Sequence, residues 1–229
     1  MRALFIVDTR PEAGLGHVVR SGALRDELTR RGWELADPGP RDADVVIVDV
    51  QQPLSLSLRG IDGSGKVVWI VDEPHGIGWG TVIYPGCSHA LLRREFADAR
   101  WNYLPIRSRP EDIAYLRNIS GMSAAVLATA IGCHKLAVTY GGQRALECMC
   151  LGTPVVVTPR NEGERLIAKT IVEHGAGVQA DEDDAESIAR ELLQNEPALQ
   201  VMSERARSLV DGLGCQRVAE EIEHLCSRA

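Results

Sequence analysis

The chain has 229 residues, enough for one large domain or two small ones that each bury a core. A net charge of −7 and only 4% aromatic residues argue against a nucleic-acid-binding surface, and no apolar run approaches the roughly 20 residues that span a bilayer. The six cysteines have no zinc-site spacing, and the chain begins directly on an expected strand. We therefore expect a reduced cytoplasmic protein without stable membrane insertion.

Apolar runs rich in β-branched residues alternate with helical patterns along the chain, which is typical of α/β proteins with parallel sheets. In the first half, strands are expected over 3–8, 33–35, 45–50, 67–72 and 82–84. Three of these strands end at or beside a carboxylate, namely Asp8, Asp49 and Asp72. Ligands of open α/β sheets collect beyond the carboxyl ends of the strands, so we expect these acids to point toward one crevice.

A helix over 89–99 and a link with two prolines over 101–110 are expected to separate the two halves. The later elements are expected as helices over 111–117 and 123–131, a strand over 135–139, a helix over 144–151, a strand over 155–157, a helix ending near 174, a strand over 178–180, and amphipathic helices from 184 onward. This pattern predicts an N-terminal Rossmann-like domain over 1–105 and a C-terminal Rossmann-like domain over 106–229, both abbreviated.

A glycine-bearing loop between the first strand and the first helix carries the first candidate site. Gly14 and Gly16 allow the backbone to approach a ligand closely, and the amides at the start of the helix favour an anion. His17 and Arg20 follow one turn apart, and a neutral imidazole, which a helix N-terminus favours, suits general base work beside carboxylates. A histidine that only packs or caps locally is the alternative, and composition alone favours it. Val19 replaces the third glycine of the dinucleotide-binding pattern, and no P-loop pattern is present.

A glycine pair between a later strand and helix carries the second candidate site. The backbone amides of Gly141, Gly142 and Gln143 can hold phosphate oxygens at the start of that helix. Glu147, within the first two turns, can accept hydrogen bonds from the two hydroxyls of a ribose. The alternative is an ordinary strand-to-helix turn in which the glutamate compensates the helix dipole.

Two polar residues follow the next strand, again on the ligand side of the expected sheet. Asn161 can donate to and accept from a sugar hydroxyl or an attacking water, and Glu162 stands beside it. Taken alone, an asparagine before a helix is more often a cap.

Four pieces of the chain resemble the nucleotide-sugar hydrolases of pseudaminic acid biosynthesis and the related spore-coat polysaccharide proteins, within the GT-B group that includes the MurG-type glycosyltransferases. These pieces are DTRPEAGLGHVVRSGALRDEL, VDEP, ALLRREFADAR and GGQRALECMCLGTPVVVTPRNEGERLIAKTIVEHGAGV, which cover about half of the chain. The first and third pieces are the ones most specific to the hydrolase branch. The glycine pair with Glu147 is shared by many GT-B transferases.

The resemblance implies a GT-B-like fold of two Rossmann-like domains with the active site in the cleft between them. It implies hydrolysis of a nucleotide-activated sugar, a UDP-sugar in the first instance, with His17 activating a water that attacks the anomeric carbon and with Asn161 near the sugar. With the residue patterns, it gives these candidates for binding substrate or nucleotide: Gly14, Gly16, Arg20, Gly141, Gly142, Gln143, Glu147 and Glu162. No cofactor or metal is expected.

The chain departs from this family in two places. The family usually carries Asn-Gln where this chain has Asn161-Glu162. It also opens its second domain with a glycine-rich strand and helix, whereas this chain passes from Ala99 almost directly into residues 120–122, so we expect the first βαβ unit of that domain to be absent. Two other functions stay open, a glycosyltransferase with the same donor and a non-catalytic nucleotide-sugar-binding or partner subunit. A homodimer would bury the sheet edge that shortening exposes.

Overall fold

The computed structural model describes residues 1–10, 15–36, 43–50, 66–72, 80–119 and 121–228. Its contacts divide the chain into two compact units, one of Met1–Leu91 with Leu213–Ala229 and one of Leu92–Gly212. The expected boundary between residues 105 and 106 falls within the second of these units, and the C-terminal helix, expected in the second domain, returns to the first unit. An amphipathic pattern predicts that a helix has an apolar face, but it does not predict which sheet that face covers.

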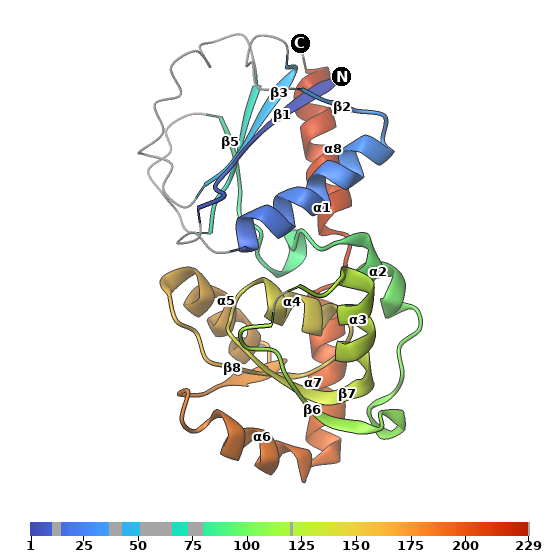
Figure 1. The fold of residues 1–229 in the computed structure, drawn as a ribbon, viewed down its shortest axis with the longest axis vertical. Coiled ribbons are helices and arrows are strands. Elements are labelled where there is room, and N and C mark those ends of the chain that lie inside the picture. Colours follow the sequence, from blue (N-terminus) through green and yellow to red (C-terminus); the bar gives the residue numbers. More distant parts are fainter. Residues whose placement is uncertain (11–14, 37–42, 51–65, 73–79, 120, 229) are drawn as a thin grey trace. The chain divides into compact units, whose positions relative to one another are not determined.

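The first unit is built on a five-stranded parallel sheet with the order β2-β1-β3-β4-β5 (Figure 1). Its strands are β1 (Arg2–Val7), β2 (Glu34–Leu35), β3 (Val45–Asp49), β4 (Lys66–Ile70) and β5 (Thr81–Ile83), which confirms the strands expected in this half. The register pairs Val7 with Asp49 and Asp49 with Ile70, so the carboxyl ends of β1, β3 and β4 share one edge. The winding reverses between β1 and β3, and open α/β sheets bind ligands at such a switch point.

Two helices pack on one face of this sheet, α1 (Gly16–Arg30) and α8 (Gly214–Ser227). Leu24 and Leu28 of α1 and Ile222 of α8 share a core cluster with Ile47 and Ile70 of the strands. The alternate residues of the same strands form a second buried cluster on the other face. Burial on both faces explains why the central strands are apolar almost throughout.

Charged contacts also hold the C-terminal helix against the rest of the first unit. Arg31, just after α1, donates to Glu27 at 2.7 Å and to Glu223 of α8 at 2.9 Å. Lys66, at the start of β4, donates to the backbone carbonyl of Leu225 in the last turn of α8. A cation there compensates both the unpaired carbonyls and the helix dipole.

The second unit contains a parallel sheet with the order β6-β7-β8-β9 (Figure 1). Its elements are α2 (Arg94–Arg100), β6 (Glu111–Tyr115), α3 (Ala124–Cys133), β7 (His134–Thr139), α4 (Gln143–Cys150), β8 (Val155–Val157), α5 (Glu162–Glu173), β9 (Gly177–Gln179), α6 (Ala185–Leu193) and α7 (Glu196–Leu209), with short 3-10 turns at Cys87–His89, in the first unit, and at Ile106–Ser108. Leu136, Val138 and Val156 of the sheet pack with Ala189 of α6 and Leu199 of α7. The strand ends that carry the second candidate site are therefore held on a packed core.

The helix expected over 111–117 was wrong, because this segment forms strand β6. Its register pairs Ile113 with Leu136 of β7, so pairing with a neighbouring strand overrides the local pattern of this exposed, charged segment. The prediction that the second domain lacks its first βαβ unit is also wrong. β6, α3 and β7 form such a unit. The helix expected over 123–131 is confirmed as α3, and the Ser123 hydroxyl caps it by accepting from the amide of Val126 at 3.4 Å.

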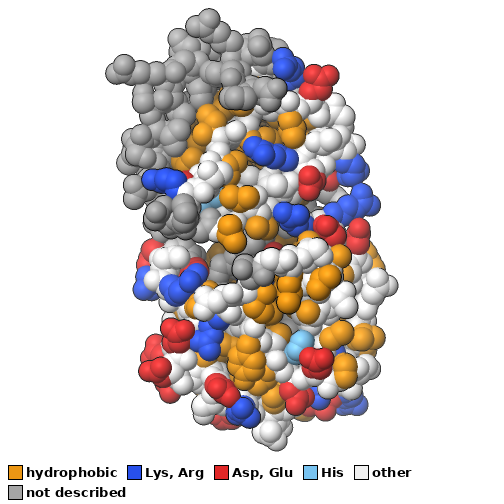
Figure 2. All heavy atoms as spheres, in the orientation of Figure 1, with side chains coloured by type: hydrophobic (Ala, Val, Ile, Leu, Met, Phe, Trp, Pro, Cys, Tyr) orange, Lys and Arg blue, Asp and Glu red, His pale blue; other side chains and the backbone are white. Residues whose placement is uncertain are grey.

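Acidic and basic side chains are interspersed over the face of the second unit that Figure 2 shows. None of the helices in the described part of the chain is both long and apolar enough to cross a membrane. The six cysteines are free, and Cys148 and Cys150 are buried. Burial raises the pKa of the Cys150 thiol to about 11, so this thiol is unreactive near neutral pH.

Candidate functional site

His17 lies in the first turn of α1 and is buried against the end of β3. Its Nδ1 atom is 2.6 Å from Oδ1 of Asp49. A carboxylate can only accept, so the contact assigns the ring proton to Nδ1 and leaves the lone pair on Nε2. Among the described residues, none is hydrogen-bonded to Nε2. The ring therefore has the tautomer and the fixed orientation that a general base needs.

Two neighbours on α1 hold the Asp49 carboxylate in place. Arg20 donates from Nε to Oδ2 at 2.9 Å and from Nη2 to Oδ1 at 2.6 Å, and the Ser21 hydroxyl donates to Oδ2 at 2.7 Å. Arg20 also donates from Nη1 to Asp72. Its Nη2 lies 2.9 Å from Nδ1 of His17, but that nitrogen carries the proton given to Asp49 and has no lone pair to accept with. The histidine and the carboxylate thus share one rigid network.

The charges of this network stabilise each other. Burial by itself raises the pKa of Asp49, but the hydrogen bonds from His17 and Arg20 outweigh it and hold that pKa below its usual range. Burial by itself lowers the pKa of Arg20, but Asp49 and Asp72 outweigh it and raise that pKa. Asp49 is therefore ionised at neutral pH and can stabilise the imidazolium that forms when His17 takes up a proton.

The structure brings together some, but not all, of the residues singled out in the first half. Asp49 and Asp72 meet at Arg20, whereas Asp8 pairs with Arg10 at 2.6 Å. Arg20, expected at the substrate, is buried and directs its guanidinium at these two carboxylates. The position of Asp49 at the end of a strand predicts its place at the crevice, but it does not predict the pairing with His17. The available signal was its position at the end of a strand that neighbours β1.

Of the two glycines expected in the first loop, the structure describes Gly16 and not Gly14. Gly14 lies outside the described residues. Gly16 begins α1, its φ is not positive, and the space where a Cβ would stand is open. The chain conformation therefore does not require a glycine at position 16, and a close approach by a ligand stays a prediction.

Glu147 lies on α4 with its side chain buried, and one carboxylate oxygen accepts from Arg144. Burial raises the pKa of Glu147 above its usual range, although the charges of Arg144 and Arg93 oppose the rise. A buried carboxylate with a raised pKa fits a binding role better than a role in stabilising the fold, because ionising it costs free energy.

Glu147→Gln is expected to leave the free energy of unfolding at pH 8 unchanged or higher. The pKa of Glu147 is raised in the folded state. The stabilisation that follows is therefore present below the pKa of 4.5 that the group has in the unfolded chain, and it is lost as pH rises through the pKa of the folded state. Wild type should therefore gain stability relative to Glu147→Gln as pH falls from 8 toward 4.5, in urea unfolding at several pH values. A relative loss on acidification would contradict the assigned direction of the shift.

The glycine pair before α4 has two separable roles. A Cβ on Gly141 would stand 2.4 Å from the backbone oxygen of Glu164, whereas the nearest atom to a Cβ on Gly142 would be 3.6 Å away. Gly141 is therefore required by the packing of this loop on α5. Gly142, the residue before the first turn of α4, is free to serve a ligand.

Gly141→Ala is expected to lower the melting temperature by several degrees, which corresponds to a destabilisation of about 2 kcal/mol. Gly142→Ala is the matched control and should melt close to wild type. Equal melting temperatures for Gly141→Ala and wild type would show that the loop does not pack on α5 in this way.

The other residues expected in this half lie at the starts of α4 and α5. Asn161 is the cap of α5, with its Oδ1 accepting from the amide of Glu164 at 2.9 Å, as the capping alternative predicted. Glu162 is exposed and pairs with Arg165 at 3.3 Å. Gln143 opens α4 and is partly buried. Within the residues that the structure describes, no group of three or more His, Cys, Asp or Glu could hold a metal ion.

Comparison with known proteins gives structural likeness without sequence likeness. No protein-family model matches the chain, and no curated protein does. MurG from Acinetobacter baumannii superposes with a TM-score of 0.63 at 12% identity, over 97% of this chain and 99% of that one. The glycosyltransferase VinC, solved in complex with dTDP, gives 0.60 at 13% identity over 100% of both chains. A UDP-N-acetylglucosamine 2-epimerase gives 0.56 at 11% identity, over 100% of this chain and 97% of that one.

Likeness at such identities establishes the fold, and it confirms the expected GT-B-like α/β architecture with two parallel sheets. The narrower resemblance to nucleotide-sugar hydrolases stays a prediction.

Proposed function

We propose that this protein is an enzyme that cleaves a nucleotide-activated sugar, with water as acceptor and a nucleoside diphosphate as leaving group. The observation that carries the proposal is the buried His17–Asp49 pair beside the switch point of the first sheet. The structural neighbours support the substrate class, since one is a glycosyltransferase solved with dTDP and another is named for a UDP-sugar.

In the proposed reaction, Nε2 of His17 accepts a proton from water as the water oxygen bonds to the anomeric carbon. The bond between that carbon and the phosphate oxygen breaks, and the diphosphate leaves with the electron pair. Asp49 stabilises the imidazolium through Nδ1, and Arg20 and Ser21 keep Asp49 in register. The proton then passes from His17 to solvent, and the base is restored.

In the second unit, the start of α4 is the proposed site for the nucleotide. The backbone amides near Gly142 and Gln143, at the start of α4, suit the diphosphate, and the buried Glu147 suits the ribose hydroxyls. Asn161 and Glu162, at the start of α5, are proposed to act near the sugar. Gly14, Gly16 and Arg20 complete the proposed set, with Arg20 acting through Asp49.

The test is release of nucleoside diphosphate from a panel of UDP-, dTDP-, CDP- and GDP-sugars. Wild type should release diphosphate from at least one of them, and His17→Ala should be slower by about 10²–10⁴-fold. His224→Ala, which removes an exposed histidine of α8, is the control and should match wild type. No release by wild type, or equal release by His17→Ala, would contradict the proposal.

The glycosyltransferases among the neighbours favour one second candidate, transfer of the sugar to a hydroxyl or amine acceptor. Diphosphate release that requires an added acceptor would support transfer, and release in water alone supports hydrolysis. Tight nucleotide binding without turnover under either condition would support the non-catalytic alternative.

A further inference from the structure

The loops that follow β7 and β8 in the second unit both contact one glutamate of α5, Glu164. Its backbone oxygen lies against Gly141, and its side-chain Cγ is 3.6 Å from where a Cβ of Gly142 would stand. Its carboxylate accepts from the backbone amide of Arg160 at 2.7 Å and from Arg160 Nη2 at 3.0 Å. Glu164 thus fixes the position of Arg160 beside the start of α4.

Arg160 is also stacked on an aromatic ring. Its guanidinium carbon lies 3.5 Å from the ring centroid of Tyr140, and the Tyr140 hydroxyl donates to Oδ1 of Asn118 at 3.2 Å. The Arg160 side chain is nevertheless 55% exposed. Tyr140 covers one face of the guanidinium, and Glu164 accepts from one edge of it. The described residues make no hydrogen bond, ion pair or ring contact with the opposite face. Arg160 therefore presents a flat, immobilised surface, which we call the Arg160 platform.

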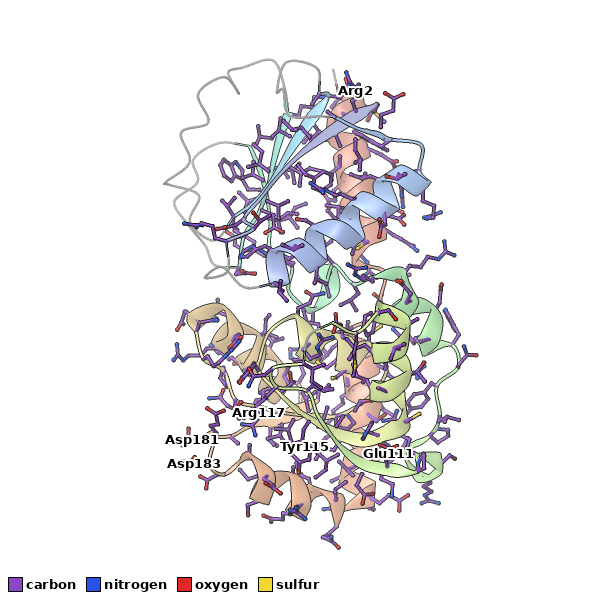
Figure 3. The ribbon with its side chains drawn as sticks, viewed as in Figure 1. Arg2, Glu111, Tyr115, Arg117, Asp181 and Asp183 are labelled. Carbon is purple, nitrogen blue, oxygen red and sulfur yellow. The ribbon has the colours of Figure 1, made fainter. Side chains whose placement is uncertain are left out.

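The charge around the Arg160 platform is already balanced. Hydrogen bonding to Glu164 raises the pKa of Arg160, and the charge of Glu182 adds to the rise against the effect of burial. Figure 3 shows Arg117 on the same side of this unit as Asp181 and Asp183 of the loop after β9, and Arg117 pairs with Glu182 at 3.3 Å. A guanidinium whose charge is already paired attracts a further anion less strongly, but the pairing does not weaken stacking by an uncharged planar group.

We propose that the nucleobase of the bound nucleoside diphosphate stacks on the open face of Arg160, with Tyr140 behind it. This inference rests on the proposed function and adds the residues that select the base. Bases stack on guanidinium planes and on aromatic rings in proteins that bind RNA or single-stranded DNA. The start of α4 would hold the phosphates, next to the platform that holds the base.

The test is calorimetric titration of the whole protein with UDP and, separately, with pyrophosphate, which has no base. Arg160→Ala and Tyr140→Leu should each weaken UDP binding by about tenfold and leave pyrophosphate binding unchanged. Arg165→Ala, which removes an exposed arginine of α5, is the control and should bind both ligands as wild type does. Because Arg160→Ala can disturb the loop, Arg160→Lys serves as a second variant. It keeps the charge without the plane and should also lose affinity for UDP alone.

Unchanged UDP binding in these variants would overturn the inference, and so would equal losses for UDP and pyrophosphate, since Arg160 would then act on phosphate. Failure of wild type to bind UDP, other nucleoside diphosphates and pyrophosphate would instead overturn the nucleotide site of the proposed function. The two failures are therefore distinguishable.

Discussion

Asp49→Asn is expected to lower kcat by about 10²–10⁴-fold. Asparagine keeps the shape of the side chain but removes the charge that stabilises the imidazolium. Its amide can also donate to Nδ1 of His17, which moves the proton to Nε2 and blocks the base. The same change leaves Arg20 with one carboxylate partner, so the free energy of unfolding should fall by about 3 kcal/mol.

Glu27→Gln separates the loss of chemistry from the loss of stability. Glu27 is a second buried carboxylate of the first unit, bonded to Arg30 at 2.6 Å and to Arg31 at 2.7 Å, and its pKa is also lowered, by those arginines against the effect of burial. It does not contact the His17 network. The variant should be less stable than wild type with kcat unchanged, and wild-type turnover by Asp49→Asn would refute the role assigned to this carboxylate.

Arg109→Met is expected to give the largest loss of stability in the second unit, about 3 kcal/mol or more. Arg109 is 2% exposed, and its guanidinium donates to the backbone oxygens of Leu104, His134, Leu151 and Gly152 and to the Thr153 hydroxyl. Methionine fills much of the volume but leaves these acceptors without donors. Burial lowers the pKa of Arg109, as expected for a buried guanidinium whose hydrogen-bond partners are neutral carbonyls and a hydroxyl.

The measurement for Arg109→Met is urea unfolding combined with hydrogen exchange resolved by peptide, because two units can unfold separately. Peptides of β7 and α4 should lose protection while those of β1 and β3 keep theirs. Arg107→Met is the control, since that side chain is 85% exposed and its pair with Glu196 contributes little. Equal stability of Arg109→Met and wild type would show that water replaces the guanidinium without cost.

Much of the fold could be predicted from periodicity, because most strands of both sheets are short apolar runs bounded by glycine, proline or acidic residues. β6 could not, since its exposed residues alternate poorly and its conformation depends on pairing with β7. The return of α8 to the first unit depends on contacts such as Arg31–Glu223, between residues far apart in the sequence. Local patterns carry no information about such contacts.

The candidate site shows the same limit. The glycine loop made His17 a candidate, but only the tertiary structure pairs it with Asp49 and directs Arg20, which was expected at the substrate, toward the same carboxylate. Glu164 was overlooked although the spacing from Asn161 is that of a capping box, a pattern that can be read from sequence. The contacts by which Asp49 and Glu164 orient their neighbours were therefore harder to predict than the candidate residues themselves.

In the proposed reaction, His17 activates a water that attacks the anomeric carbon. Turnover of an accepted nucleotide sugar in ¹⁸O-labelled water, quenched early and analysed by mass spectrometry, tests it most directly. We expect ¹⁸O in the free sugar and none in the diphosphate, at a rate that falls with His17→Ala. Label in the diphosphate would place the attack at phosphorus and refute the proposed reaction, as would label in the sugar at an equal rate in His17→Ala.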